Sequence, residues 1–272
     1  MASLVTEKYR NVSSAEIDGW VDKFHRDGFL FLESFLEKEL VKELRQDLDK
    51  ALEGNENPEA SMELHHAMFE KSQGNLSLFD LEPMVSFAEK LVAPNCQVFH
   101  NNSFRTHSDG INSWHQDDDL HYVVKEGDPP QNINLPVLFF TANYYLTDVE
   151  SLEKGPTQLV PGSHLLGRRP PGSERAVHGT VDAMEGTEYE DKVFSALGGA
   201  GSVICFNNQV WHRGGPNSSG STRYITQVSY GRRMIGGLWP PYVNYQMPKH
   251  VYENADDRLL RLLGFKKPGA YA

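Results

Sequence analysis

A histidine and an aspartate two residues apart, His115 and Asp117 in the segment WHQDDD, have the types and spacing of metal ligands. In a strand, side chains at positions i and i+2 project from the same face, so this imidazole and carboxylate can converge on one ion. His212, which follows the apolar run GSVICFNNQVW, is the strongest candidate for a third ligand. Two imidazoles and one carboxylate form the facial triad of Fe(II) oxygenases, which leaves coordination positions open for a co-substrate and dioxygen.

Arg223 lies eleven residues after His212, at the start of the strand-like segment RYITQVSY. A guanidinium is suited to a bidentate grip on a carboxylate. This arrangement fits a 2-oxo acid that chelates the metal at one end and whose far carboxylate is held by Arg223. The residues therefore predict an Fe(II) enzyme that uses a 2-oxo acid and O2.

Other interpretations remain open from the residues alone. A second HxD pair, His107 and Asp109, is present, and either pair by itself is more typical of hydrogen bonding in a loop. The three ligands also suit a zinc hydrolase with an activated water, although Arg223 then has no explanation. A binding protein that has kept the fold and lost the chemistry is the alternative from another class. Asp118, Asp119 and His121 are assigned no role.

The elements that must position these residues are helical near the N-terminus. Ser13 and Glu16 have the spacing of a capping box and predict a helix that ends at Gly28. A short strand, a second amphipathic helix and a third helix are predicted at residues 29–35, 36–54 and 81–92.

From residue 96 the pattern changes to short apolar runs separated by Gly, Pro, Asn and Asp. Five strands are predicted, at residues 96–106, 137–147, 156–163, 201–211 and 222–234. No convincing helix separates them, which favours an antiparallel sandwich or barrel over a parallel α/β sheet. The segment VYENADDRLLRLLGF then predicts a short helix in the tail.

The composition of this 272-residue chain argues against some classes of binding partner. A formal net charge of -11 argues against nucleic acid and against an anionic membrane surface, both of which require clustered Lys and Arg. No run approaches the roughly 18 apolar residues of a membrane span. Two cysteines are too few for a disulfide framework, so we expect a reducing, cytoplasmic location.

Four motifs in order resemble the phytanoyl-CoA dioxygenase family of Fe(II)- and 2-oxoglutarate-dependent oxygenases. They are FHRDGFLFLESFL, WHQDDD, KGPTQLVPGSH and GSVICFNNQVWHRGGPNSSGSTRYITQVSY. The resemblance implies a mainly β fold with flanking helices, a double-stranded β-helix or cupin-like jelly roll. It also implies one domain over residues 1–272, with a mostly helical region at 1–95, the jelly-roll core at 96–235 and a tail with a short helix at 236–272.

Carried onto this sequence, the resemblance implies that His115, Asp117 and His212 bind iron and that Arg223 binds the distal carboxylate of 2-oxoglutarate. The resemblance favours His115 and Asp117 over the pair His107 and Asp109, because the family's HxD precedes the PGSH motif at about the distance found for His115. Thr157 matches a threonine that related fungal biosynthetic oxygenases place near the co-substrate. Asn143 is a second, weaker candidate for the same neighbourhood.

The family's halogenases replace the carboxylate ligand with a small residue, whereas Asp117 is present here. The resemblance therefore implies oxidation of a small molecule by hydroxylation, desaturation or rearrangement, with release of succinate and CO2. A natural product or amino-acid-like substrate is preferred, and 2-hydroxylation of an acyl-CoA is the alternative. Analogy with related biosynthetic enzymes also suggests a homodimer.

Overall fold

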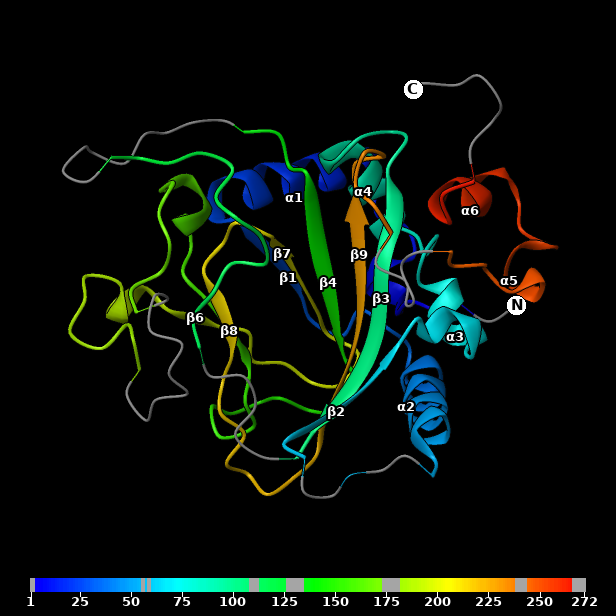
Figure 1. Cartoon of the computed structure of the whole chain (residues 1–272), viewed down its shortest axis with the longest axis horizontal. Coiled ribbons are helices and arrows are strands. Elements are labelled where there is room, and N and C mark those ends of the chain that lie inside the picture. The colour runs from blue at the N-terminus through cyan, green and yellow to red at the C-terminus, as the bar shows by residue number, and fades with distance from the viewer. Residues whose placement is uncertain are drawn as a thin grey trace.

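Two antiparallel sheets form the framework of the computed structural model (Figure 1), which describes residues 3–54, 57, 60–107, 113–125, 135–172, 182–237 and 244–265. The larger sheet has the order β1 (Phe29–Leu32), β7 (Val203–Asn207), β4 (Phe139–Tyr145), β9 (Arg223–Gly231), β3 (Gln97–Thr106) and β2 (Met62–His66). The smaller sheet has the order β6 (Phe194–Ser195), β5 (Thr157–Leu159) and β8 (His212–Gly214). All of these strand pairs are antiparallel, as the pattern of short apolar runs predicts.

Helices cover the outer face of the larger sheet (Figure 1), chiefly α1 (Ser14–Asp27), α2 (Lys38–Leu52) and α4 (Met84–Leu91). The predicted capping box is present, because the Ser13 side chain accepts from the Glu16 amide and the Glu16 carboxylate accepts from the Ser13 amide. Gly28 ends α1 with φ of 83°, a left-handed conformation that glycine adopts without a steric penalty.

Short helices complete the chain. They are η1 (Glu7–Tyr9), η2 (Met68–Glu70), α3 (Gln73–Ser77), η3 (Ser163–Leu165), η4 (Glu190–Lys192), α5 (Lys249–Tyr252) and α6 (Asp257–Leu262). No helix in the described part of the chain is both long enough and apolar enough to span a bilayer.

The main hydrophobic core lies between these helices and the sheet. Phe24 of α1, Phe87 of α4 and Phe140 of β4 meet edge to face with ring centroids 5.5 to 5.8 Å apart, and Tyr230 of β9 stacks on Phe140 at 5.3 Å. Because successive side chains of a strand point to opposite faces, the alternate residues of β4 and β9 are directed away from the helices. Those residues line the cavity described below.

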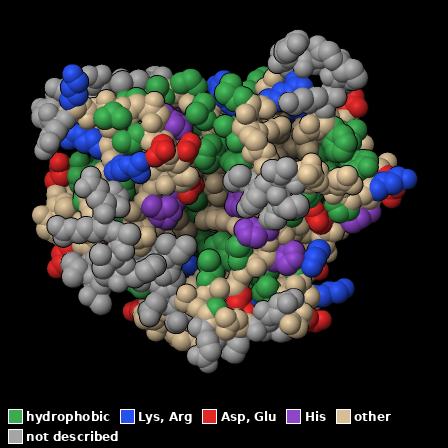
Figure 2. Space-filling model, viewed as in Figure 1, with side chains coloured by type: hydrophobic (Ala, Val, Ile, Leu, Met, Phe, Trp, Pro, Cys, Tyr) green, Lys and Arg blue, Asp and Glu red, His purple; other side chains and the backbone are tan. Residues whose placement is uncertain are grey.

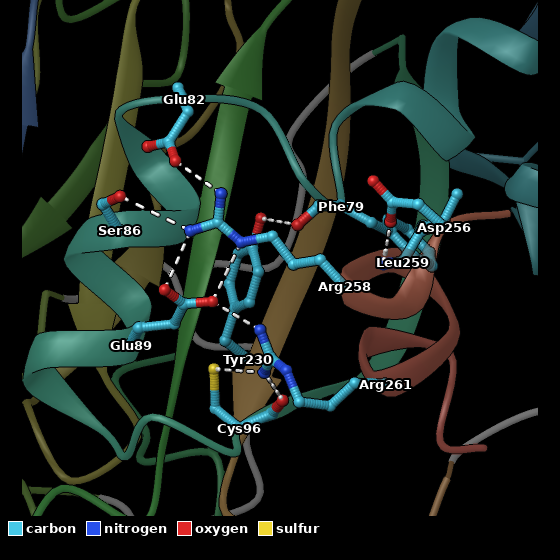
Figure 3. A network of polar contacts seen from close by, with 10 residues as sticks. All are labelled: Phe79, Glu82, Ser86, Glu89, Cys96, Tyr230, Asp256, Arg258, Leu259 and Arg261. Carbon is cyan, nitrogen blue, oxygen red and sulfur yellow. Dashed lines mark hydrogen bonds and ion pairs between the residues drawn. The ribbon is translucent and has the colours of Figure 1, made fainter. Parts of the chain in front are cut away.

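The tail is held against the same core by an ionic cluster (Figure 3). Arg258 of α6 pairs with Glu89 of α4 at 2.8 Å and with Glu82 at 2.5 Å, and Arg261 also pairs with Glu89. Arg261 additionally donates to the carbonyl of Cys96, at the entry to β3. These contacts fix α6 to the outer, helical side of the molecule.

Candidate metal centre

His115, Asp117 and His212 meet at one point, as their types and spacing predict. The Asp117 Oδ1 atom lies 3.3 Å from His212 Nε2 and 3.9 Å from His115 Nε2. All three potential ligand atoms lie within 4.8 Å of one another, and no other such group of three occurs among the described residues. The His212 side chain is 6% exposed, that of Asp117 27% and that of His115 38%, so the centre is open on the side of the HxD segment.

Backbone pairing brings the two distant segments together. His115 and His212 form an antiparallel bridge in which each amide donates to the other's carbonyl at 3.0 Å. The Asp117 amide donates to the carbonyl of Asn208, also at 3.0 Å. The HxD segment thus lies along the edge of β8, and its i and i+2 side chains point to the same side as His212.

Each imidazole is oriented by a backbone carbonyl two residues earlier. His115 Nδ1 lies 2.9 Å from the Ser113 carbonyl oxygen, and His212 Nδ1 lies 2.9 Å from that of Val210. A carbonyl only accepts, so Nδ1 carries the proton and Nε2 presents its lone pair to the centre. The sequence does not reveal these anchors, because any residue supplies the same carbonyl.

The close contact of His115, Asp117 and His212 shifts the pKa values of all three side chains. Burial, reinforced by His212, lowers the pKa of His115. Burial raises the pKa of Asp117, but the neighbouring His212 and His115 outweigh it and the net pKa is lowered. Burial lowers the pKa of His212, yet Asp117 outweighs it and the net pKa is raised. The ionised Asp117 and the neutral His115 are ready to bind a cation, and a proton on His212 Nε2 would leave when the cation binds.

Trp114 and Arg213, which are next to His115 and His212 in the sequence, stabilise the opposite side of the same segments. Trp114 donates from Nε1 to Asp182 at 2.8 Å, and Arg213 donates to the other oxygen of that carboxylate at 2.5 Å. The Arg213 guanidinium lies 4.8 Å from the centre of the Trp114 ring. This network ties the segment of His115 to that of His212 on the side away from the ligands.

The PGSH motif supports the strand that carries His212. The Ser163 hydroxyl donates to the Val160 carbonyl at 2.7 Å and accepts from the Trp211 amide at 2.8 Å. His164 Nε2 lies 3.0 Å from the carbonyl of His25, at the end of α1. The motif is therefore structural in this protein, and its histidine does not join the centre.

A cavity of about 420 Å³ lies between the two sheets, next to the three ligands. Figure 2 shows a hollow near the middle of this face, with hydrophobic side chains inside it and histidine side chains around it. Its wall on the larger sheet is built from alternate residues of β3, β4 and β9, namely His100, Asn102, Phe104, Thr106, Phe139, Thr141, Asn143, Arg223, Ile225, Gln227 and Ser229.

Arg223 lines this cavity at the start of β9 and is only 5% exposed. Its Nη2 atom makes one long hydrogen bond, 3.4 Å, to Thr106 Oγ1, whereas Nε and Nη1 are buried without a partner. Burial lowers the pKa of Arg223, an effect that Tyr145 opposes. A buried, unpaired guanidinium is unfavourable by itself, so this geometry fits an anionic group in the cavity.

Thr157 and Asn143 line the same cavity. The Thr157 amide donates to the Tyr145 hydroxyl at 3.0 Å, while Asn143 Oδ1 accepts from Gln227 at 2.8 Å. Their roles toward a co-substrate stay predictions. Asn102, whose Oδ1 is buried without a partner, lies two strands from Asn143 and was not predicted from the sequence.

The alternative ligands lie elsewhere. His107 is engaged through Nε2 with Glu63 at 2.6 Å and through Nδ1 with Thr222 at 3.2 Å, and Asp109 lies outside the described residues. Asp118 lies 3.5 Å from His121 Nε2, and the exposed Asp119 pairs with Arg169 at 2.5 Å. Neither Asp118 nor Asp119 accepts a hydrogen bond from His115 or His212, because the Nδ1 atom of each of these imidazoles donates to a backbone carbonyl.

Two imidazoles and a carboxylate at the mouth of an antiparallel two-sheet cavity define the class of non-haem metal oxygenases. The chain belongs to the Phytanoyl-CoA dioxygenase (PhyH) family, whose sequence profile matches residues 24–225. The family prediction made from the four motifs is thereby confirmed. No curated protein sequence matches the chain significantly.

Solved structures show the same fold. HygX from Streptomyces hygroscopicus with nickel and 2-oxoglutarate bound has a TM-score of 0.63 at 18% identity, covering 81% of this chain and 87% of its own. The epimerase SnoN from nogalamycin biosynthesis, in complex with Fe3+, alpha ketoglutarate and nogalamycin RO, has 0.59 at 18%, covering 80% and 84%. The carbocyclase SnoK from the same biosynthesis has 0.59 at 21%, covering 85% and 87%. The predicted jelly roll with flanking helices is confirmed.

Proposed function

We propose that this protein is an Fe(II)- and 2-oxoglutarate-dependent dioxygenase that oxidises a small organic molecule and releases succinate and CO2. Family membership and the three-ligand centre support the class of chemistry. The observation that carries the co-substrate assignment is Arg223, a buried guanidinium with two unpartnered nitrogens in the cavity that the ligands border.

His115 and His212 would hold the iron through Nε2, and Asp117 through its carboxylate. Iron, when bound, supplies the activation of dioxygen that is coupled to decarboxylation of the 2-oxo acid. The protein's own contribution is placement: the carbonyls that hold each Nδ1 fix the tautomer and the ring orientation before the metal arrives.

In the proposed binding mode, 2-oxoglutarate lies along the inner face of the larger sheet. Arg223 is in register with Thr106 and offers its unpartnered N–H groups to the distal carboxylate. The next row, Phe104 opposite Ile225, is apolar and suits the two methylene groups. Beyond it, Asn102 is opposite Gln227, and Asn143 is on the other side of Gln227, so this amide row is placed to contact the 2-oxo acid end. Thr157 faces the same cavity from the smaller sheet.

The prime substrate is proposed to be a natural product or an amino-acid-like molecule. The similar structures are an epimerase and a carbocyclase from antibiotic biosynthesis and HygX, which has also been crystallised with hygromycin B. These proteins share one fold but differ in the reaction they catalyse, so the fold does not determine whether the reaction is a hydroxylation, a desaturation or a rearrangement. An acyl-CoA substrate is the alternative. The homodimer and the cytoplasmic location stay predictions.

Oxygen dependence separates this proposal from a zinc hydrolase. Purified protein supplied with Fe(II) and 2-oxoglutarate should release succinate in air and none under argon, and His115→Ala should abolish the release. Zn(II) in place of Fe(II) should give no succinate. Turnover under argon, or activity supported by Zn(II), would show that the centre activates water instead.

A further inference from the structure

Beyond the amide row, three hydrogen-bonding side chains lie side by side on the inner face of the larger sheet. Ser229 of β9 is in register with His100 of β3 on one side and with Thr141 of β4 on the other. The Thr141 and Ser229 hydroxyls lie 2.9 Å apart, and His100 Nδ1 lies 3.5 Å from the Ser229 hydroxyl. We call these three residues the hydroxyl row.

The co-substrate is too short to occupy this row. Ser229 is six positions after Arg223 along β9, which corresponds to about 20 Å at about 3.4 Å per residue in an antiparallel strand. A five-carbon diacid whose far carboxylate is held by Arg223 reaches the metal and the amide row but not this distance. The hydroxyl row therefore faces the part of the cavity that remains for the prime substrate.

The row is nevertheless close to the metal centre. Thr141 is in register with Phe206 of β7, and the Phe206 ring lies 4.5 Å from the ring of His212 between centroids. A molecule bound against the row is thus held next to the ligand cluster. This is where a C–H bond has to be placed for oxidation.

The row combines polar groups with an aromatic border. Phe99 and Phe139 line the cavity and contact each other edge to face at 5.0 Å. Burial, reinforced by His66 and opposed by Asp117, lowers the pKa of His100 to about 4, so its ring is neutral at neutral pH. The second ring nitrogen of His100 has no hydrogen-bond partner within the described segments.

We propose that His100, Thr141 and Ser229 bind the hydroxyl groups of a hydroxylated ring, such as a cyclitol or a sugar, in the prime substrate. This inference rests on the proposed function. Hydroxyls and a neutral imidazole both donate and accept, which matches uncharged hydroxyl groups. An alkyl chain would use none of the donor and acceptor capacity that remains on these groups beside their hydrogen bonds to one another.

Ligand-observed NMR on the protein loaded with Fe(II) and 2-oxoglutarate under argon tests the inference. The probes are two matched pairs, myo-inositol against cyclohexanol and methyl glucoside against tetrahydropyran. The hydroxylated member of each pair should bind at least tenfold more tightly. The double variant Thr141→Val, Ser229→Ala should weaken its binding about five- to tenfold, the effect of losing about 1 kcal/mol or more of hydrogen bonding.

Thr106→Val is the matched control, since it makes the same change in the same cavity at the Arg223 end. At saturating 2-oxoglutarate it should leave binding of the hydroxylated rings unchanged. Calorimetry of 2-oxoglutarate binding to the double variant should give the wild-type affinity, which shows that its fold and co-substrate site are intact.

Equal binding within each pair, or full binding by the double variant, would overturn the inference while the proposed function stands. Failure of the iron-loaded wild-type protein to bind 2-oxoglutarate at all would remove both.

Discussion

Replacing Arg223 with methionine should have opposite effects on co-substrate binding and on the stability of the ligand-free protein. The guanidinium is 5% exposed, and two of its three nitrogens have no partner. Hydrogen bonds to charged groups contribute about 1.5–3 kcal/mol, so Arg223→Met should weaken 2-oxoglutarate binding about ten- to a hundredfold or more. Metal affinity should be unchanged, because Arg223 lies at the far end of the cavity.

The same substitution should stabilise the ligand-free protein. Methionine removes a desolvated charge that no carboxylate among the described residues neutralises, and we expect a gain of about 1–2 kcal/mol. At about 2–4 °C per kcal/mol for a chain of this size class, the melting temperature should rise by a few degrees.

Arg105→Met is the matched control. Arg105 pairs with Glu63 at 2.6 Å and with Asp49 at 2.8 Å, so its loss leaves the nearly buried Glu63 carboxylate short of a partner and should lower the melting temperature. Calorimetry with Fe(II) under argon and thermal unfolding measure the two effects. Unchanged 2-oxoglutarate affinity in Arg223→Met, or destabilisation as large as that of Arg105→Met, would refute the assignment of Arg223.

Two further predictions concern the scaffold. The pKa of Glu63 is lowered from 4.5 to about 2, chiefly by a hydrogen bond from Arg105 that outweighs the effect of burial. The ionised Glu63 carboxylate therefore contributes its full stability above pH 4.5, and this contribution is lost as the pH falls toward 2. The difference in unfolding free energy between wild type and Glu63→Gln should therefore shrink over that range in acid titrations, and a constant difference would contradict this. Ser163→Ala leaves the buried Trp211 amide unpaired, which should cost about 1–3 kcal/mol in chemical denaturation; no measurable loss would show that the PGSH turn does not support the His212 strand.

The candidate ligands could be singled out from the sequence because the signals that mark them are local. An HxD in extended backbone places both side chains on one face, and His212 comes five residues after the end of β7, an apolar strand that has to be buried. The capping box at Ser13 was predictable because it depends on spacing within one short segment, and the antiparallel class because short apolar runs follow one another with no long helix between them.

Features that depend on pairing between distant strands could not be predicted. The amide row and the hydroxyl row arise because β3 and β4 both pair with β9, more than 70 residues away from either, and the register is set by tertiary packing. β2 was not predicted because the apolar alternation of MELHH is limited to Met62 and Leu64, and its buried Glu63 depends on distant partners, Arg105 and His107.

The charge-transfer absorption of the Fe(II) protein on addition of 2-oxoglutarate under argon tests the central claim most directly. This visible absorption requires the metal in the centre and the 2-oxo acid chelated to it in the same cavity. We predict that it appears with the wild-type protein, is absent from His212→Ala, and needs far higher 2-oxoglutarate concentrations in Arg223→Met. Its absence from the iron-loaded wild-type protein, or its persistence in His212→Ala, would contradict the account.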